Sequence, residues 1–202
     1  MTTRRILVAG IGNIFMGDDA FGVEVVGKLL QRPQPEGVRV VDFGIRGLDL
    51  TYALLDGFET VILVDAAPRG GTPGTLYVIE PELDSLAAAP SPPQIQAHNL
   101  DPVHVLRLVQ ALGGQVGKLL VVGCEPEATR DDAVDDEMRM GLSPAVQGAV
   151  DAAVDLVETL VAGLCENVSE SLTRPGTDTR PGTDKPGGTP SPRESLCPRI
   201  EG

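Results

Sequence analysis

Apolar and polar residues form two kinds of segment along this chain, short apolar runs and longer helical repeats. The short runs are typical of strands buried on both faces of a sheet, and they cover residues 6–9, 38–42, 60–65, 75–79 and 118–123. The helical repeats cover residues 19–31, 48–55, 100–112 and 144–164. This alternation predicts an α/β fold, with a mostly parallel twisted sheet of about five strands and helices on both faces.

Local signals refine this prediction. A loop rich in glycine and proline, residues 69–74, precedes the run at 75–79, so that strand is a candidate for antiparallel pairing. Asp18 is a good cap for the helix at 19–31, and Pro144 suits the first position of the last helix. Residues 83–97 are rich in alanine and proline, and we expect them to be irregular.

The character of the chain changes near residue 167. The segment 173–178, Thr-Arg-Pro-Gly-Thr-Asp, is repeated directly at 179–184. A stretch rich in proline, glycine and threonine with few apolar residues cannot offset the entropy cost of ordering. We therefore predict one folded domain, residues 1–166, and a disordered tail, residues 167–202.

Composition narrows the class of protein. The net charge is −13, which argues against binding to a phosphate backbone. No apolar run reaches the roughly 18 residues of a membrane span, and the N-terminus lacks a signal-peptide pattern. The cysteines Cys124, Cys165 and Cys197 have neither zinc-type spacing nor a disulfide framework, and we expect Cys124 to be a buried structural thiol. We expect a soluble cytoplasmic protein with no nucleic-acid or membrane partner.

Carboxylates follow two of the predicted strands. The first strand leads through Gly10-Ile-Gly12-Asn13 to Asp18 and Asp19, and the strand at 60–65 ends in Asp65. The carboxyl ends of parallel strands share one edge of the sheet, where open α/β folds place their working residues. Asp19 is also explained by the helix dipole. Asp65 requires a partner, because it ends an apolar strand.

The chain has two histidines. His98 precedes the helix at 100–112, and His104 lies within it, where we expect it to face solvent. Asp19, Asp65 and His98 provide a mixed oxygen and nitrogen ligand set that suits a divalent transition metal. A metal site is one interpretation, and structural carboxylates are the other.

The glycines after the first strand also suggest a dinucleotide site, but only weakly. Phe15 stands where the third glycine of that fingerprint is expected. The acid that the fingerprint requires after about 20 residues would have to be Asp42, which lies too far along the chain.

Taken together, these motifs resemble those of the hydrogenase maturation endopeptidases, over residues 5–164. The matching motifs are Gly10-Ile-Gly12-Asn13 with Asp18-Asp19 and Gly22, Leu63-Val-Asp65-Ala66, His98 before a helix, and Gly141-Leu-Ser-Pro144. The resemblance implies a cytoplasmic peptidase, of aspartic or metal-dependent type, with no organic cofactor. It removes the C-terminal extension of a [NiFe]-hydrogenase large-subunit precursor after nickel insertion, and that precursor supplies the nickel. The family's metal and catalytic positions fall on Asp19, Asp65 and His98.

Two positions depart from the family pattern. Relatives often have Glu at the first acidic position, and Asp19 is one methylene shorter. The Gly-Gly-Thr motif common after the second strand is absent, and Phe43, Gly44 and Ile45 stand there instead. Asp42 and Arg46 beside this loop are candidates either for contacting the extension or for a structural role. The alternative function is a nickel-dependent checkpoint that binds the precursor without cutting it.

Overall fold

The computed structural model describes residues 5–81, 102–127 and 140–171. The strands are β1 (Ile6–Ile11), β2 (Val38–Gly44), β3 (Thr60–Ala66), β4 (Leu76–Ile79) and β5 (Lys118–Cys124). The helices are a 3-10 turn, η1 (Gly17–Ala20), followed by α1 (Phe21–Leu29), α2 (Gly47–Leu55), α4 (Pro102–Ala111) and α5 (Pro144–Ser171).

The five strands form one sheet in the order β2-β1-β3-β5-β4. The first four strands in this order run parallel to one another, and β4 at the edge runs antiparallel to β5. This confirms the predicted α/β class and the predicted orientation of the strand near 75–79. The chain leaves β1 toward β2 on one side and then crosses to β3 on the other, so the strand order reverses between β1 and β3.

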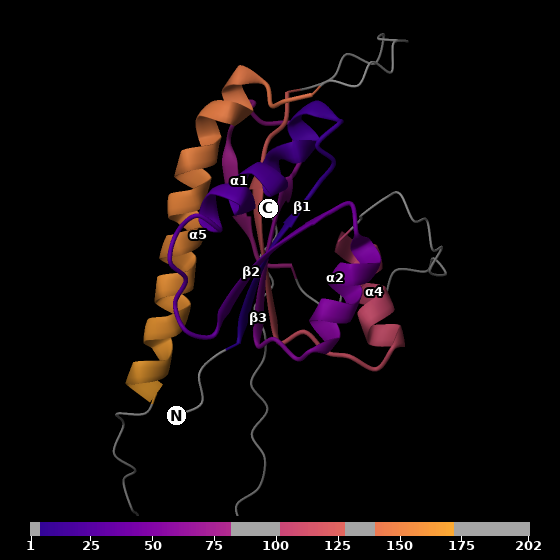
Figure 1. Cartoon of the computed structure of the whole chain (residues 1–202), viewed down its shortest axis with the longest axis vertical. Coiled ribbons are helices and arrows are strands. Elements are labelled where there is room, and N and C mark those ends of the chain that lie inside the picture. The colour runs from indigo at the N-terminus through magenta and orange to yellow at the C-terminus, as the bar shows by residue number, and fades with distance from the viewer. Residues whose placement is uncertain (1–4, 82–101, 128–139, 172–202) are drawn as a thin grey trace, which may run out of the picture.

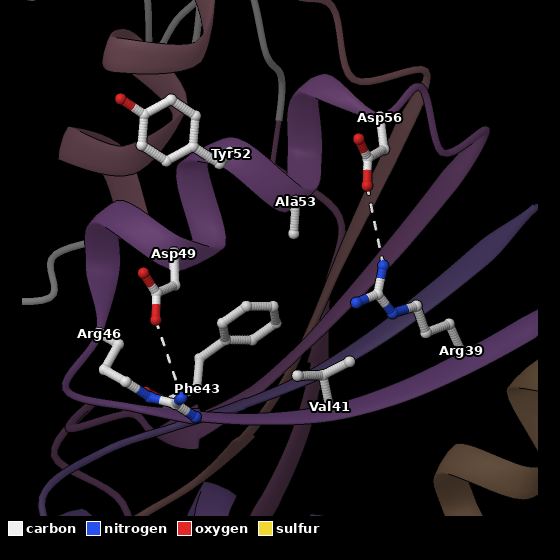
Figure 2. Close-up of a pocket in the computed structure, with 8 residues that line it drawn as sticks. All are labelled: Arg39, Val41, Phe43, Arg46, Asp49, Tyr52, Ala53 and Asp56. Carbon is white, nitrogen blue, oxygen red and sulfur yellow. Dashed lines mark hydrogen bonds and ion pairs between the residues drawn. The ribbon is translucent and has the colours of Figure 1, made fainter.

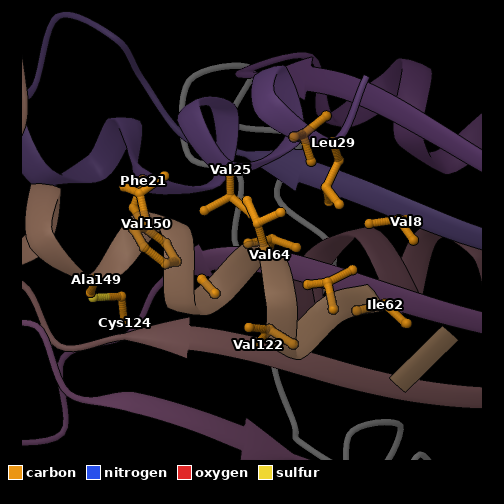
Figure 3. Close-up of a cluster of buried hydrophobic side chains, with 14 of the residues drawn as sticks. Val8, Phe21, Val25, Leu29, Ile62, Val64, Val122, Cys124, Ala149 and Val150 are labelled. Carbon is orange, nitrogen blue, oxygen red and sulfur yellow. The ribbon is translucent and has the colours of Figure 1, made fainter. Parts of the chain in front are cut away.

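Helices cover both faces of the sheet (Figure 1). On one face, α1 and α5 bury Val8, Ile62, Val64 and Val122 in a core that Figure 3 shows from close by. On the other face, side chains such as Leu63 pack with α2 and α4. Aliphatic side chains make up nearly all of both clusters, as the low aromatic content indicates.

The structure tests some of the boundaries predicted from the sequence, and other predicted boundaries lie outside the described residues. Helix α5 begins at Pro144, as predicted, and continues to Ser171, past residue 166 where we expect the domain to end. The segment 83–97 and the rest of the predicted tail, from 172 on, lie outside the described residues. Within the described part, no helix is both long and apolar enough to cross a membrane.

Candidate functional site

Tight packing of backbone shapes the turn that follows β1. Gly12 has a φ of +132°, and its N–H donates to the Gly44 carbonyl oxygen at 3.0 Å, which links the ends of β1 and β2. A Cβ atom on Gly12 would overlap with the carbonyl group of Asp19. The space above this glycine is therefore filled by the protein's own backbone, and the glycine serves close packing.

This turn places Asp19 at the carboxyl edge of the sheet. Asp19 lies in η1 and is half-buried, and its Oδ2 accepts a hydrogen bond from the Asn13 N–H at 2.7 Å. Asn13 is the one hydrogen-bond partner of this carboxylate among the described residues. The turn thus orients the carboxylate through one oxygen and leaves the other oxygen for a further contact.

Asp65 lies at the end of β3, next to β1. It is half-buried, and its Oδ1 accepts a hydrogen bond from the N–H of Ala66 at 2.8 Å. Side chains alternate along a strand, so Asp65 faces the same side as Leu63, which packs in the cluster with α2 and α4.

Asp19 and Asp65 belong to neighbouring elements at the point where the strand order reverses. Gly10 of β1 is paired with Val64 of β3, and η1 packs against β3. The crevice outside the carboxyl ends of the strands at such a point is the usual ligand site of open α/β sheets. The fold therefore offers two carboxylates at the position where this class of fold binds ligands.

His98, the third predicted ligand, lies outside the described residues. The helix that follows it, α4, begins at Pro102 and packs on the face toward which Asp65 points. Among the described residues, no group of three or more His, Cys, Asp or Glu side chains is placed to hold a metal ion. The two aspartates nevertheless fit a metal in their chemistry, since carboxylate oxygen is a common ligand of divalent ions.

Asp18 has a different role from the predicted one. Its carboxylate does not cap its own helix; it accepts hydrogen bonds from the N–H of Ser143 at 2.6 Å, from Ser143 Oγ at 2.9 Å and from the N–H of Glu127 at 2.8 Å. Ser143 precedes α5, so the negative charge lies at the positive end of that helix dipole. The predicted cap is wrong because Asp18 lies inside the 3-10 turn, where its side chain reaches these long-range donors. Asp18 thereby ties the turn that carries Asp19 to α5.

Glu125 is a buried carboxylate that we did not predict. It is only 4% exposed and directly follows β5. Its carboxylate accepts hydrogen bonds from the backbone N–H groups of Arg69 and Gly70 at 2.9–3.0 Å and from the Tyr77 hydroxyl at 2.8 Å. Burial raises the pKa of this carboxyl, but the hydrogen bonds from Tyr77 and the backbone outweigh burial and bring the pKa below its usual 4.5.

Glu125 acts as an anchor for the loop after Asp65. The loop leaves β3 through Ala67, whose N–H donates to the Cys124 carbonyl oxygen at 2.8 Å, and reaches the glutamate at Arg69. The signal that points to Asp65, an acid directly after an apolar strand, is also present at Glu125. Applied there, it would have marked this residue.

The structure also gives the surroundings of three other residues that were considered from the sequence. Cys124 is fully buried, and burial, with the nearby charges of Asp18 and Glu125, raises the pKa of its thiol to about 11, which confirms a structural thiol. His104 is half-buried on α4, so the prediction that it faces solvent is wrong. The Arg46 side chain donates to the carbonyl oxygens of Asp42 and Phe43, at the end of its own strand.

Comparisons with known proteins agree with this fold and identify the family. A family model described as hydrogenase maturation protease matches residues 23–160. The chain is 31% identical over 153 residues to the hydrogenase expression/formation protein HoxM of Azotobacter vinelandii, covering 74% of this chain and 72% of that protein. It is also 31% identical over 147 residues to the hydrogenase 2 maturation protease of Escherichia coli, covering 72% of this chain and 84% of that protein.

Solved structures give the same result. The hydrogenase maturating endopeptidase HybD from E. coli superposes with a TM-score of 0.60 at 26% identity, covering 79% of this chain and 93% of that one. A hydrogenase 2 maturation peptidase from a Thaumarchaeota archaeon has a TM-score of 0.57 at 31% identity, covering 79% and 99%. The chain therefore belongs to the hydrogenase maturation protease family.

Proposed function

We propose that this protein removes the C-terminal extension of a [NiFe]-hydrogenase large-subunit precursor after nickel has been inserted. The observation that carries the proposal is the pair Asp19 and Asp65, which lie on neighbouring elements at the reversal of the strand order. Membership of the hydrogenase maturation protease family supports peptide cleavage as the reaction. The expected cytoplasmic location stays a prediction.

In this proposal, nickel arrives with the substrate. The precursor holds the ion mainly through its own cysteines, and Asp19, Asp65 and His98 complete or replace part of its coordination. Binding the ion orients the nearby peptide bond, and orientation alone contributes several kcal/mol, about 7–11 in the best cases. The ion or one of the two carboxylates then activates a water molecule against the scissile carbonyl group. No nucleophilic serine or cysteine is required.

The test is a cleavage assay with the precursor in two forms, loaded with nickel and prepared without it. Mass spectrometry should show loss of the extension only from the loaded form. Asp19→Asn and Asp65→Asn should each lower the rate by at least about 100-fold, because the peptide bond is no longer held in position. Asp151→Asn is the matched control, since Asp151 lies on the surface of α5 in an ion pair with Lys28.

The outcomes separate the proposal from its alternative. Cleavage by Asp19→Asn at the wild-type rate would remove the proposed site. A stable complex with the nickel-loaded precursor and no change in mass would identify the non-cleaving checkpoint instead.

A further inference from the structure

A groove of about 360 Å³ lies between β2 and α2, away from the two aspartates. Figure 2 shows Val41 and Phe43 of β2 and Ala53 of α2 pointing into the space between the strand and the helix. Phe43 and Ala53 are buried and Val41 is half-buried, so they give the groove an apolar floor. This floor has the character of a surface that binds apolar side chains.

An arginine and an aspartate stand at each end of the groove (Figure 2). Arg46 lies 3.7 Å from Asp49, and Arg39 lies 3.7 Å from Asp56. All four side chains are more than half exposed, so these ion pairs are weak, and the Arg39 guanidinium is able to exchange its partner for another carboxylate. Arg46 also donates to two backbone carbonyl oxygens of β2, which hold it in place. The two arginines balance the two aspartates of the groove, so its lining is neutral in a chain with a net charge of −13 and repels an acidic group less than the average surface does.

The groove is open to a peptide because of its place in the sheet. Strand β2 lies at the edge, and among the described strands its only neighbour is β1. Peptides commonly bind in extended form along such an edge. The Arg46 end of the groove adjoins the carboxyl edge of the sheet, where the Gly12 N–H binds the Gly44 carbonyl oxygen. From there, Asp65 on β3 is two strand spacings away, roughly 10 Å.

We propose that this groove binds the extension that the proposed cleavage removes, as an extended segment running from the Arg46 end to the Arg39 end. The direction follows from the site, since a chain cut near Asp19 and Asp65 enters the groove at the carboxyl end of β2 and runs antiparallel to it. The length of β2 from Phe43 to Arg39 accommodates about five extended residues. Apolar side chains of the segment lie on the floor, and a carboxylate of the segment pairs with Arg39.

This inference rests on the proposed function, and its test measures binding separately from cleavage. The probe is a fluorescein-labelled synthetic peptide with the sequence of the extension of the precursor used in the cleavage assay. Its binding is followed by fluorescence anisotropy with the full-length protein. Wild type and Asp19→Asn should bind it equally, because the carboxylate of Asp19 lies outside the groove.

Two groove variants test the floor and the charge. Ala53→Phe fills the floor, and Arg39→Glu reverses the charge at the far end; each should weaken peptide binding by at least about tenfold. In the cleavage assay, each should raise KM by a similar factor with kcat nearly unchanged. The matched controls are Ala152→Phe, at an exposed alanine of α5, and Lys28→Glu, in another exposed ion pair.

Each outcome has a distinct meaning. Wild-type peptide affinity and KM in both groove variants, with normal cleavage, would overturn the groove and leave the proposed function intact. Absence of peptide binding to wild type would overturn the groove as well. Peptide binding that depends on Ala53 and Arg39, without any cleavage by wild type, would support the groove and overturn the proposed peptidase. Arg39→Glu is a surface change, so the test does not depend on how well Ala53→Phe folds.

Discussion

At the scale of single residues, two glycines of α1 have opposite surroundings. A Cβ atom on Gly22 would overlap with the carbonyl oxygens of Ile11 and Val64, whereas a Cβ atom on Gly27 would meet nothing within 4 Å. We predict that Gly22→Ala lowers the free energy of unfolding by about 1–3 kcal/mol, because the backbone of the neighbouring strands must move. Gly27→Ala should raise it by about 0.5–1 kcal/mol, through higher helix propensity. Urea denaturation measures both, and effects of the same sign would contradict this prediction.

The hydrogen bond between Tyr77 and Glu125 makes stability depend on pH. The folded state lowers the pKa of Glu125, so its hydrogen bonds stabilise the protein above the usual value of 4.5 and lose that effect as the pH falls through the lower folded value. We predict that Tyr77→Phe lowers Tm at neutral pH and that the difference from wild type shrinks in acid. Thermal denaturation between about pH 7 and pH 3 measures this difference.

Tyr52→Phe is the control for this measurement. It removes the hydroxyl group of a tyrosine that is 58% exposed on α2. Its Tm should follow that of wild type at every pH. A difference between Tyr77→Phe and wild type that stays constant into acid would show that the glutamate is not responsible.

The sequence points to some residues of the candidate site and not to others, for a physical reason. Asp19 and Asp65 were found because the ends of parallel strands meet at one edge, which depends only on local pattern. The partners of Asp18 were not found, because Ser143 lies 125 positions and Glu127 lies 109 positions further along the chain. No local pattern indicates which of many distant N–H groups a carboxylate will meet.

At the scale of elements, two neighbouring leucines at the end of α1 differ sharply in burial. Leu29, the last residue of α1, is 1% exposed and packs in the core against the sheet, while Leu30 is 54% exposed. We predict that Leu29→Ala lowers the free energy of unfolding by about 2–5 kcal/mol, the usual cost of a cavity in a core. Leu30→Ala should change it by less than about 0.5 kcal/mol. Chemical denaturation compares the two, and equal effects would mean that α1 is packed differently.

Apolar periodicity was enough to locate the helices and strands, because each element must bury one face or both. It was not enough for two local features. The 3-10 turn η1 replaces the first turn of the expected helix, since the backbone there packs against Gly12. The pairing of β1 with β2 shifts register between Gly10 and Ile11, and that shift depends on contacts between strands.

At the scale of the whole molecule, the excess of negative charge opposes the compact state. The net charge is −13, and the surface ion pairs of Lys28 and Arg32 with α5 offset little of it. We predict that Tm rises as sodium chloride increases from about 0.01 to 0.2 M, because salt screens the repulsion. A calorimetric series at constant pH measures this, and a fall in Tm would show that specific ion pairs dominate.

The strand order is a property of the whole molecule that the sequence only partly determines. Alternating strands and helices predict parallel neighbours, but β5 lies between β3 and β4 although it follows both in the chain. The position of β5 depends on how the whole sheet packs against the helices on both of its faces. The reversal of the strand order between β1 and β3, beside Asp19 and Asp65, also becomes visible only in the structure.

The contact between Asp18 and Ser143 has a consequence for synthesis on the ribosome. The turn of Asp18 leaves the ribosome early, yet its hydrogen bonds to Ser143 form only after 125 further residues have been translated. A translation product that ends before Ser143 therefore carries Asp19 in a turn that lacks these hydrogen bonds. We expect such truncated products to be less ordered around Asp19 than a chain that includes the start of α5.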